Sequence, residues 1–217
     1  MIRPDPCRTR RAAARLACGV AAAALLMMGR PAFAQEHHHQ EAGPAAAPSY
    51  GLTRETSPFA AGFKVLRSDG VVVDLASLRG PAIVTMFFAT CPDVCPLMTE
   101  HILQIERRLA PAERDRLQVV LVSFDDRDQP GVLESYRKAH GIDSPRWTVA
   151  LAPAGVRERL AGVLGVRFQK LPDGSFSHTA MVDLVDEHGR IAAQAPATAL
   201  DDPEFRAAVG AMLAPEE

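Results

Sequence analysis

The sequence predicts an α/β fold in which a central mixed β-sheet is flanked by helices. Two runs, 82–89 (AIVTMFFA) and 117–124 (LQVVLVSF), are apolar almost throughout and rich in β-branched residues. Such runs are typical of strands that are covered on both faces. Each run is followed by a stretch in which apolar residues recur at helical spacing. This alternation is typical of layered α/β domains.

The individual elements can be placed in order along the chain. Turn residues at 68–70 and at 187–189 indicate a hairpin at each of these places. The expected strands are 63–66, 71–74, 82–89, 117–124, 147–151, 182–185 and 191–193, and the expected helices are 96–109, 132–140, 156–164 and 202–213. This order, without an internal repeat, indicates a thioredoxin-like sandwich with an added N-terminal hairpin.

Residues 1–34 have the features of a secretory signal peptide. A basic leader precedes a short apolar run at 16–28, and Ala32-Phe33-Ala34 fits a small-x-small cleavage site. The apolar run is shorter than the roughly 20 residues that a spanning helix needs. We therefore expect a periplasmic protein without a transmembrane anchor after cleavage. Twin-arginine export at Arg10-Arg11 and a lipid anchor on Cys18 are less favoured alternatives.

The remaining chain divides into a tail and one domain. Residues 35–58 are rich in Ala, Pro, Gly and Glu, which predicts a flexible tail. Within it, His37, His38 and His39 form a tract that can bind transition metals or remain a solvated polar patch. Residues 59–217 have the size of one domain with its own core.

The expected mature chain is acidic. Cleavage removes six of the 24 Lys and Arg residues and one of the 26 Asp and Glu residues, which leaves 18 against 25 and a formal net charge of −7. Nucleic acid is therefore not an expected partner.

Cleavage also removes Cys7 and Cys18, so Cys91 and Cys95 are the two remaining thiols. Cysteines separated by three residues lie about one turn apart on one face of a helix, where one soft metal ion could bridge them. Export also permits a structural disulfide bond. This alternative is less favoured because closing so short a loop constrains the unfolded chain very little.

The position of the cysteine pair favours reactive thiols. The pair lies between the predicted strand at 82–89 and the predicted helix at 96–109. Free N–H groups and the dipole at a helix N-terminus stabilise negative charge, so we expect thiolates to form readily. Pro96 suits the first helical turn, which places Cys95 at the helix cap and Cys91 on the preceding loop.

Three aspartates follow the second buried strand. Asp125, Asp126 and Asp128 lie at the edge of the sheet where sites of this fold class gather, and they could bind an ion or a partner. A polar loop that caps the next helix is the more common arrangement.

Three segments carry a resemblance to a known family. FFATCPDVCP at 87–96, FDDRD at 124–128 and SHTAMVDLVDEHGR at 177–190 resemble the SCO/SenC family of copper chaperones and cytochrome c oxidase assembly factors. The resemblance covers about 63–193 and implies a thioredoxin-like fold, with copper bound by Cys91, Cys95 and His178.

His178 lies 83 residues after Cys95, so only the fold can bring it to the cysteines. It precedes a late strand that could bring it over the cysteine loop, although a solitary histidine is more often a surface or capping residue. Two thiolates and an imidazole suit Cu(I) and Cu(II), and zinc is the chemical competitor.

We therefore expect a monomeric, exported copper chaperone rather than an enzyme. By resemblance, its recipient is the dinuclear copper site in subunit II of cytochrome c oxidase. One alternative is a thiol-disulfide oxidoreductase in which Cys91 and Cys95 are a catalytic redox pair that reduces the recipient's cysteines. A second alternative is a periplasmic copper buffer to which the histidine tract contributes.

Overall fold

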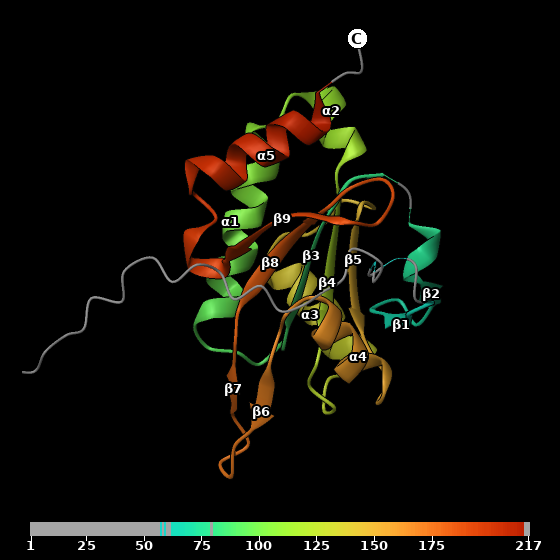
Figure 1. The fold of residues 1–217 in the computed structure, drawn as a ribbon. Helices are drawn as coiled ribbons and strands as arrows, with labels where there is room; N and C mark the ends of the chain where they lie inside the picture. Colours follow the sequence, from blue (N-terminus) through green and yellow to red (C-terminus); the bar gives the residue numbers. More distant parts are fainter. Residues whose placement is uncertain (1–56, 58, 60–61, 79, 215–217) are drawn as a thin grey trace, which may run out of the picture. The chain divides into compact units, whose positions relative to one another are not determined.

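A seven-stranded mixed sheet forms the centre of the computed structural model, which describes residues 57, 59, 62–78 and 80–214 (Figure 1). Its spatial order is β2-β1-β5-β4-β3-β8-β9. The strands are β1 (Lys64–Arg67), β2 (Val72–Asp74), β3 (Ala82–Phe87), β4 (Gln118–Ser123), β5 (Trp147–Leu151), β8 (Met181–Val185) and β9 (Ile191–Pro196). The neighbours β3, β4 and β5 run parallel, and the other pairs in the sheet are antiparallel.

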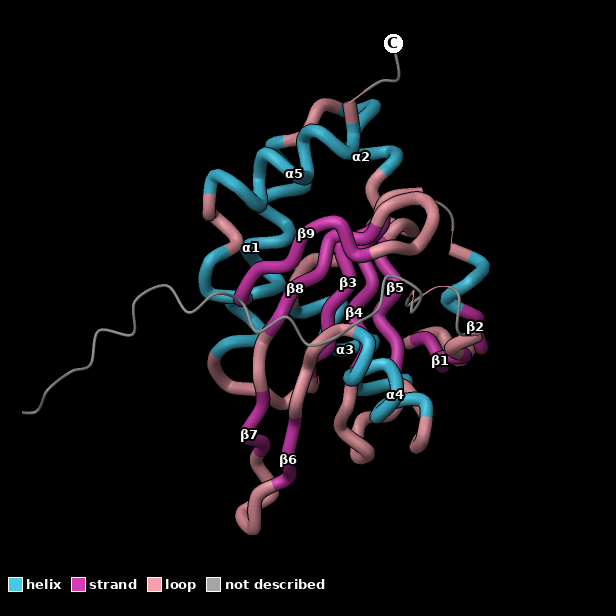
Figure 2. The backbone as a smooth tube through the Cα atoms, in the orientation of Figure 1, coloured by secondary structure: helices cyan, strands magenta, loops and turns pink. Residues whose placement is uncertain are grey.

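Helices cover both faces of this sheet (Figures 1 and 2). They are α1 (Val94–Arg108), α2 (Pro111–Arg116), α3 (Pro130–Ala139), α4 (Val156–Val163) and α5 (Pro203–Leu213), with short 3-10 turns at Leu75–Ser77 and Ala197–Ala199. On one face, Thr85 of β3 contacts Met98 of α1. On the other face, Gln194 of β9 donates a hydrogen bond to the carbonyl of Leu164 at the end of α4. The predicted thioredoxin-like α/β fold is therefore confirmed.

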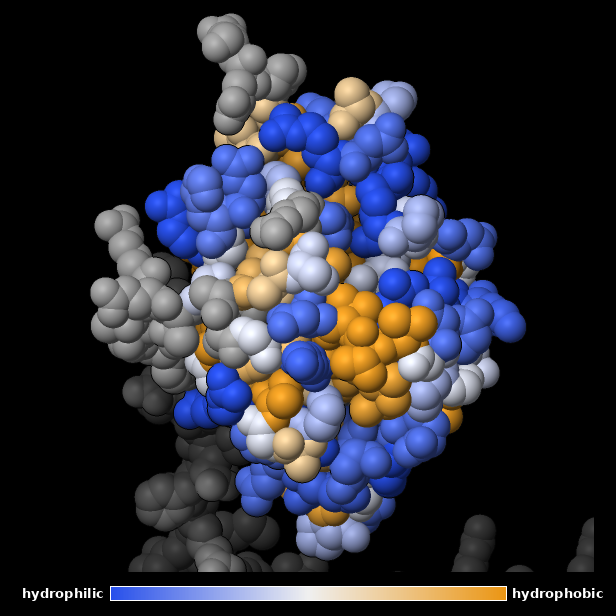
Figure 3. All heavy atoms as spheres, turned by 90° about the vertical axis from the view of Figure 1, so that its right-hand side faces the viewer, coloured by the Kyte–Doolittle hydropathy of each residue, from blue (hydrophilic) through white to orange (hydrophobic). Residues whose placement is uncertain are grey.

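The central strands form the core because their sequences lack polar alternation. All six residues of β3 are buried, as are five of the six in β4. Such strands belong in the middle of a sheet covered on both faces. The edge strand β2 differs, since its first residue, Val72, is 63% exposed and the preceding Val71 is 52% exposed. Figure 3 views the domain from the side of β1 and β2 and shows apolar surface gathered there.

Two elements were not predicted. One is the short helix α2, and the other is a separate hairpin of β6 (Phe168–Lys170) and β7 (Phe176–His178), which extends beyond the main sheet (Figure 1). His178 consequently ends β7, three residues before β8 begins. It precedes the late strand β8, as expected, but it is the last residue of the unpredicted strand β7, and Thr179 and Ala180 connect the two strands.

Some sequence-based predictions fall outside the described residues. These are the signal peptide at 1–34 and the tail at 35–58 with its histidine tract, apart from Ser57. Within the described part of the chain, no helix combines the length and apolar character needed to cross a bilayer.

Candidate metal centre

Two side chains of the cysteine motif meet a distant histidine at one end of the sheet. The sulfurs of Cys91 and Cys95 and a ring nitrogen of His178 all lie within 4.8 Å of one another. Cys91 comes from the loop after β3, Cys95 from the first turn of α1, and His178 from the end of β7. Both cysteines are free thiols. The structure thus brings together the three residues that the sequence analysis singled out as metal ligands.

The topology explains why these segments meet. Strands β3 and β4 are parallel, so the loops that follow them lie side by side, and the Phe124 N–H donates to the carbonyl of Phe87 at 2.9 Å. Strand β8 is antiparallel to β3, so its beginning lies near the end of β3. The hairpin that precedes β8 therefore delivers His178 to the loop that follows β3.

A buried carboxylate holds the loop that carries Cys91. The Ala89 N–H donates to Oδ2 of Asp128 at 3.0 Å, and the Ser123 hydroxyl donates to the same oxygen at 2.6 Å. The Cys91 N–H donates to the Phe88 carbonyl at 3.2 Å. Asp128 thus ties the end of β3 to the end of β4 beside the cysteines.

Cys95 is the second residue of α1, whose N-cap is Asp93. The prediction that Cys95 caps the helix is therefore wrong, because the helix begins inside the cysteine motif, before Pro96. Cys91 does lie on the preceding loop, as predicted.

Tyr136 of α3 fixes the first turn of α1. Its hydroxyl donates to the Cys95 carbonyl at 3.2 Å and shares a 2.7 Å hydrogen bond with the Thr99 hydroxyl. Its ring packs against Phe87, with centroids 4.8 Å apart. This buried contact joins α3, α1 and β3 beneath the cysteines, and sequence reasoning did not find it.

Burial raises the pKa of the Cys95 thiol well above its ordinary value. A hydrogen bond with the Phe88 backbone only partly offsets this effect, and the nearby Cys91 and Asp128 add to it. The prediction that thiolates form readily is therefore wrong for Cys95, because loss of hydration outweighs the helix N-terminus. A metal ion that binds Cys95 has to displace its proton.

His178 is held by an aromatic neighbourhood and by its own backbone. Its ring lies 5.6 Å from Phe88 and 5.3 Å from Phe124 between centroids. Its Nδ1 lies 3.3 Å from the Thr179 carbonyl oxygen, which can only accept a hydrogen bond. The tautomer that makes this bond carries the proton on Nδ1 and leaves the Nε2 lone pair for a ligand.

A groove of about 390 Å³ opens beside His178. It is lined by His178 together with Arg167, Phe168, Gln169, Ser177 and Thr179. Because His178 is only partly buried, the site can be approached from this side.

Two sulfurs and one imidazole nitrogen form a soft to borderline donor set. Donor atoms around one tetrahedral ion lie roughly 3.5–3.8 Å apart, as bond lengths of about 2.0–2.3 Å require. The separations of up to 4.8 Å reach this range with small side-chain adjustments. The residues therefore fit one copper or zinc ion with an open position.

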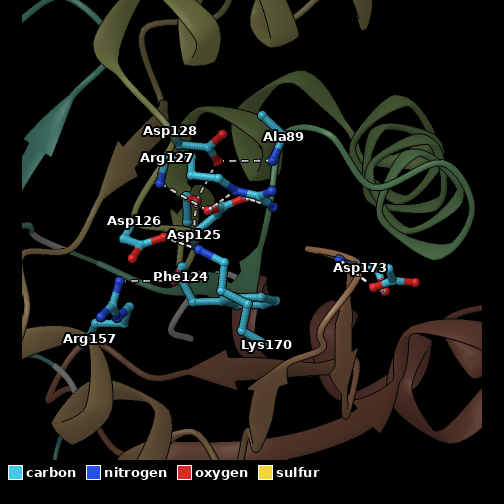
Figure 4. A network of polar contacts seen from close by, with 11 residues as sticks. Ala89, Phe124, Asp125, Asp126, Arg127, Asp128, Arg157, Lys170 and Asp173 are labelled. Atoms are coloured by element: carbon cyan, nitrogen blue, oxygen red, sulfur yellow. Dashed lines mark hydrogen bonds and ion pairs between the residues drawn. The ribbon is translucent and has the colours of Figure 1, made fainter.

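The acidic loop after β4, which Figure 4 shows, does not belong to this donor group. Asp125 accepts hydrogen bonds from the Arg127 backbone and guanidinium. Asp126 pairs with Lys170 at 3.1 Å, and this contact lowers the pKa of Asp126. The expected helix-capping role is wrong, since α3 has Gln129 as its N-cap with no side-chain cap hydrogen bond.

No other group of three metal-binding side chains occurs in the part of the chain that the structure describes. Asp93 is exposed and makes no side-chain cap hydrogen bond at the start of α1. His188 lies in the β8–β9 turn and pairs with Glu187.

Comparison with known proteins gives consistent matches. The SCO1/SenC family model matches residues 52–214. The SCO1 protein homolog of Bacillus subtilis (strain 168) is 29% identical over 98 residues, which cover 44% of this chain and 48% of that protein. The chain thus matches about half the length of this curated relative.

Solved structures show a similar fold. Bradyrhizobium japonicum ScoI with copper bound is 22% identical, with 69% of this chain and 96% of that chain covered and a TM-score of 0.58. BsSco, described as having a disulfide switch and as a member of the Sco family of cytochrome c oxidase assembly proteins, is 21% identical, with 70% and 91% covered and a TM-score of 0.58.

The fold and the three converging side chains define a thioredoxin-like protein with a Cys-Cys-His centre. The family match covers most of the chain, so the protein belongs to the SCO1/SenC family.

Proposed function

We propose that this protein binds one copper ion through Cys91, Cys95 and His178 and passes it to another protein. The observation that carries the proposal is the convergence of these three donors within 4.8 Å. Thiolates favour Cu(I) and imidazole also suits Cu(II), so the set can accommodate both oxidation states. The copper-bound state of ScoI from Bradyrhizobium japonicum supports copper over zinc as the cargo.

The recipient in this proposal is the dinuclear copper site of cytochrome c oxidase subunit II. Support comes from family membership and from the description of BsSco as belonging to the cytochrome c oxidase assembly proteins. Incoming thiols would replace Cys91 and Cys95 one at a time, and the groove beside His178 gives a partner access.

The proposal places the transfer in the periplasm. Residues 1–34 serve as the signal peptide, residues 35–58 form a tail, and residues 59–217 form the copper-carrying domain. The exported protein acts as a monomer in this proposal, and a monomer is sufficient because one chain supplies all three donors.

Copper titration of the reduced exported protein tests the proposal. The wild type is expected to bind one equivalent and to show sulfur-to-Cu(II) charge-transfer absorption. Cys91→Ser, Cys95→Ser and His178→Ala should each weaken binding and change this absorption, whereas His188→Ala is the matched control. Unchanged binding and absorption in His178→Ala would remove this residue from the site.

A thiol-disulfide oxidoreductase is the second candidate function. It is favoured by two neighbouring free thiols, Cys91 and Cys95, at a helix N-terminus. The raised pKa of Cys95 opposes rapid exchange at this sulfur. Reduction of an oxidised subunit II fragment by the copper-free His178→Ala variant at the wild-type rate would favour this function over copper delivery.

A copper buffer is the third candidate, in which the tract at 37–39 contributes. Deletion of residues 35–56 separates it from the chaperone. We expect the shortened protein to keep one equivalent of copper, whereas a buffer would lose part of its capacity.

A further inference from the structure

The hairpin that carries His178 is short, and hydrogen bonds at its turn and at its base, such as Thr179 N–H to the Arg167 carbonyl, add to its strand pairs. Strands β6 and β7 share three residue pairs, and neither strand pairs with the main sheet. An isolated two-stranded hairpin is marginally stable in water. The position of His178 relative to the cysteines must therefore depend on contacts with other segments.

One set of contacts is aromatic and lies beneath the hairpin. Phe168 stacks on Phe124 with centroids 4.7 Å apart, and Phe176 lies 5.2 Å from Phe88 and 5.3 Å from Phe124. Such pairs stabilise by about 0.5–1.5 kcal/mol beyond the area they bury. They hold the hairpin against the ends of β3 and β4, but they do not constrain its outer surface.

A second set of contacts comes from the β4–α3 loop (residues 124–129) and reaches the outer part of the hairpin (Figure 4). The Arg127 guanidinium lies over the Phe176 ring, 5.6 Å from its centroid. A Cβ added at Gly174, in the hairpin turn, would lie 3.1 Å from Nη1 of Arg127. Lys170 on β6 pairs with Asp126 at 3.1 Å. The loop therefore contacts the hairpin at both strands and at the turn.

Arg127 is itself fixed in place. Its Nε and Nη2 donate to both oxygens of Asp125 at 2.7–3.1 Å, and the Asp125 carboxylate is buried. A planar guanidinium that is held bidentately by a carboxylate is pre-organised for stacking on a ring. In the same loop, Asp128 binds the Ala89 N–H, two residues before Cys91.

We infer that the β4–α3 loop fixes the distance between His178 and the two cysteines, with Arg127 as the positioning residue. This one loop accepts a hydrogen bond from the cysteine loop through Asp128. It also contacts the histidine hairpin, through the Arg127 guanidinium over a ring and through the Asp126 ion pair. The inference rests on the proposed copper site for its functional meaning. The contacts that support it are made by the protein without copper.

The test compares Arg127→Ala and Lys170→Ala with a matched control, Arg190→Ala. Arg190 also donates to an aspartate, Asp186, but lies in the β8–β9 turn at the other end of β8. In the copper-free, reduced protein, the His178 ring protons feel the ring currents of Phe88 and Phe124. We expect Arg127→Ala to move their NMR shifts towards those of an exposed histidine, Lys170→Ala to move them less, and Arg190→Ala to leave them unchanged.

Copper binding supplies the second measurement. Arg127→Ala should still bind one equivalent through the cysteines, with affinity lowered about tenfold and with a weaker imidazole nitrogen signature in the Cu(II) EPR spectrum. A folded Arg127→Ala protein with wild-type His178 shifts and affinity would overturn the inference. If Arg127→Ala does not fold, unchanged His178 shifts in Lys170→Ala would overturn it. If the wild type binds copper without His178, the proposed function fails. The spectra of the copper-free variants still test whether the β4–α3 loop positions His178.

Discussion

At the scale of single residues, burial sets the chemistry of the ionisable groups. Cys91 and Cys95 occupy the same short motif, yet they are 8% and 1% exposed. Asp183 of β8 is fully buried, and one of its carboxylate oxygens has no hydrogen-bond partner. An ionised side chain that loses its hydration raises the free energy of the folded state. Burial therefore raises the pKa of Cys95 and of Asp183.

The two thiols should react at different rates. Because Cys95 is more deeply buried and its pKa is raised, brief alkylation of the reduced, copper-free protein at neutral pH should modify Cys91 first. Mass spectrometry of the digested protein measures the order. The denatured protein is the control and should lose the preference, whereas equal rates in the folded protein would contradict the prediction.

Asp183 should make stability depend on pH. Burial raises its pKa from 3.8 to about 8, and a hydrogen bond from Gln194 offsets only part of this effect. Because the folded protein holds this proton more tightly than the unfolded chain, the stabilisation is fully present below about pH 4 and is lost as the pH rises towards 8. The free energy of unfolding should fall by a few kcal/mol in total over this interval, as ~1.4 kcal/mol per pKa unit implies for a buried group.

Urea denaturation at a series of pH values measures this effect. Asp183→Asn should flatten the dependence between pH 4 and 8, and Asp201→Asn, on an exposed residue, is the control. A parallel pH dependence in Asp183→Asn and the wild type would show that Asp183 does not titrate in this range.

At the scale of elements, helix α1 depends on a contact with α3 as well as on its own sequence. Its N-cap residue makes no side-chain cap hydrogen bond. The Tyr136 hydroxyl instead binds the first two turns through the carbonyl of Cys95 and the hydroxyl of Thr99. The cysteine helix is therefore anchored at its functional end by a neighbouring helix.

Tyr136→Phe should destabilise the protein by about 1–2 kcal/mol, because the substitution leaves buried partners on α1 unsatisfied. Chemical denaturation gives the change in the free energy of unfolding. In a double-mutant cycle with Thr99→Val, the two losses should be less than additive, since the residues share one hydrogen bond. Fully additive losses would mean that this bond contributes nothing.

The elements also show what the sequence can and cannot predict. The sequence predicts strands β3, β4 and β5 to within a few residues from short runs rich in apolar residues, and helices α3, α4 and α5 from apolar residues at helical spacing. The β6–β7 hairpin was missed because its strands have only three residues each and its aromatic side chains depend on Phe88 and Phe124, which are distant in sequence. The cysteine spacing predicted a paired site, but the raised pKa of Cys95 depends on tertiary burial that no local pattern contains.

At the scale of the whole domain, the mixed sheet brings three distant segments to one edge. Parallel β3 and β4 place the cysteine loop beside the β4–α3 loop, and antiparallel β8 returns the histidine hairpin to the same place. Each donor comes from a different element, so the metal centre exists only when the domain is folded. Copper that binds all three donors should therefore stabilise the folded state by mass action.

X-ray absorption at the copper edge of the loaded protein tests the central claim most directly, because it counts the atoms around the metal. We expect two sulfur neighbours and one imidazole nitrogen in the wild type. In His178→Ala the imidazole should be lost while both sulfurs remain, and Cys95→Ser should lose one sulfur. A wild-type spectrum without imidazole, or one that His178→Ala leaves unchanged, would contradict the claim that Cys91, Cys95 and His178 hold the same ion.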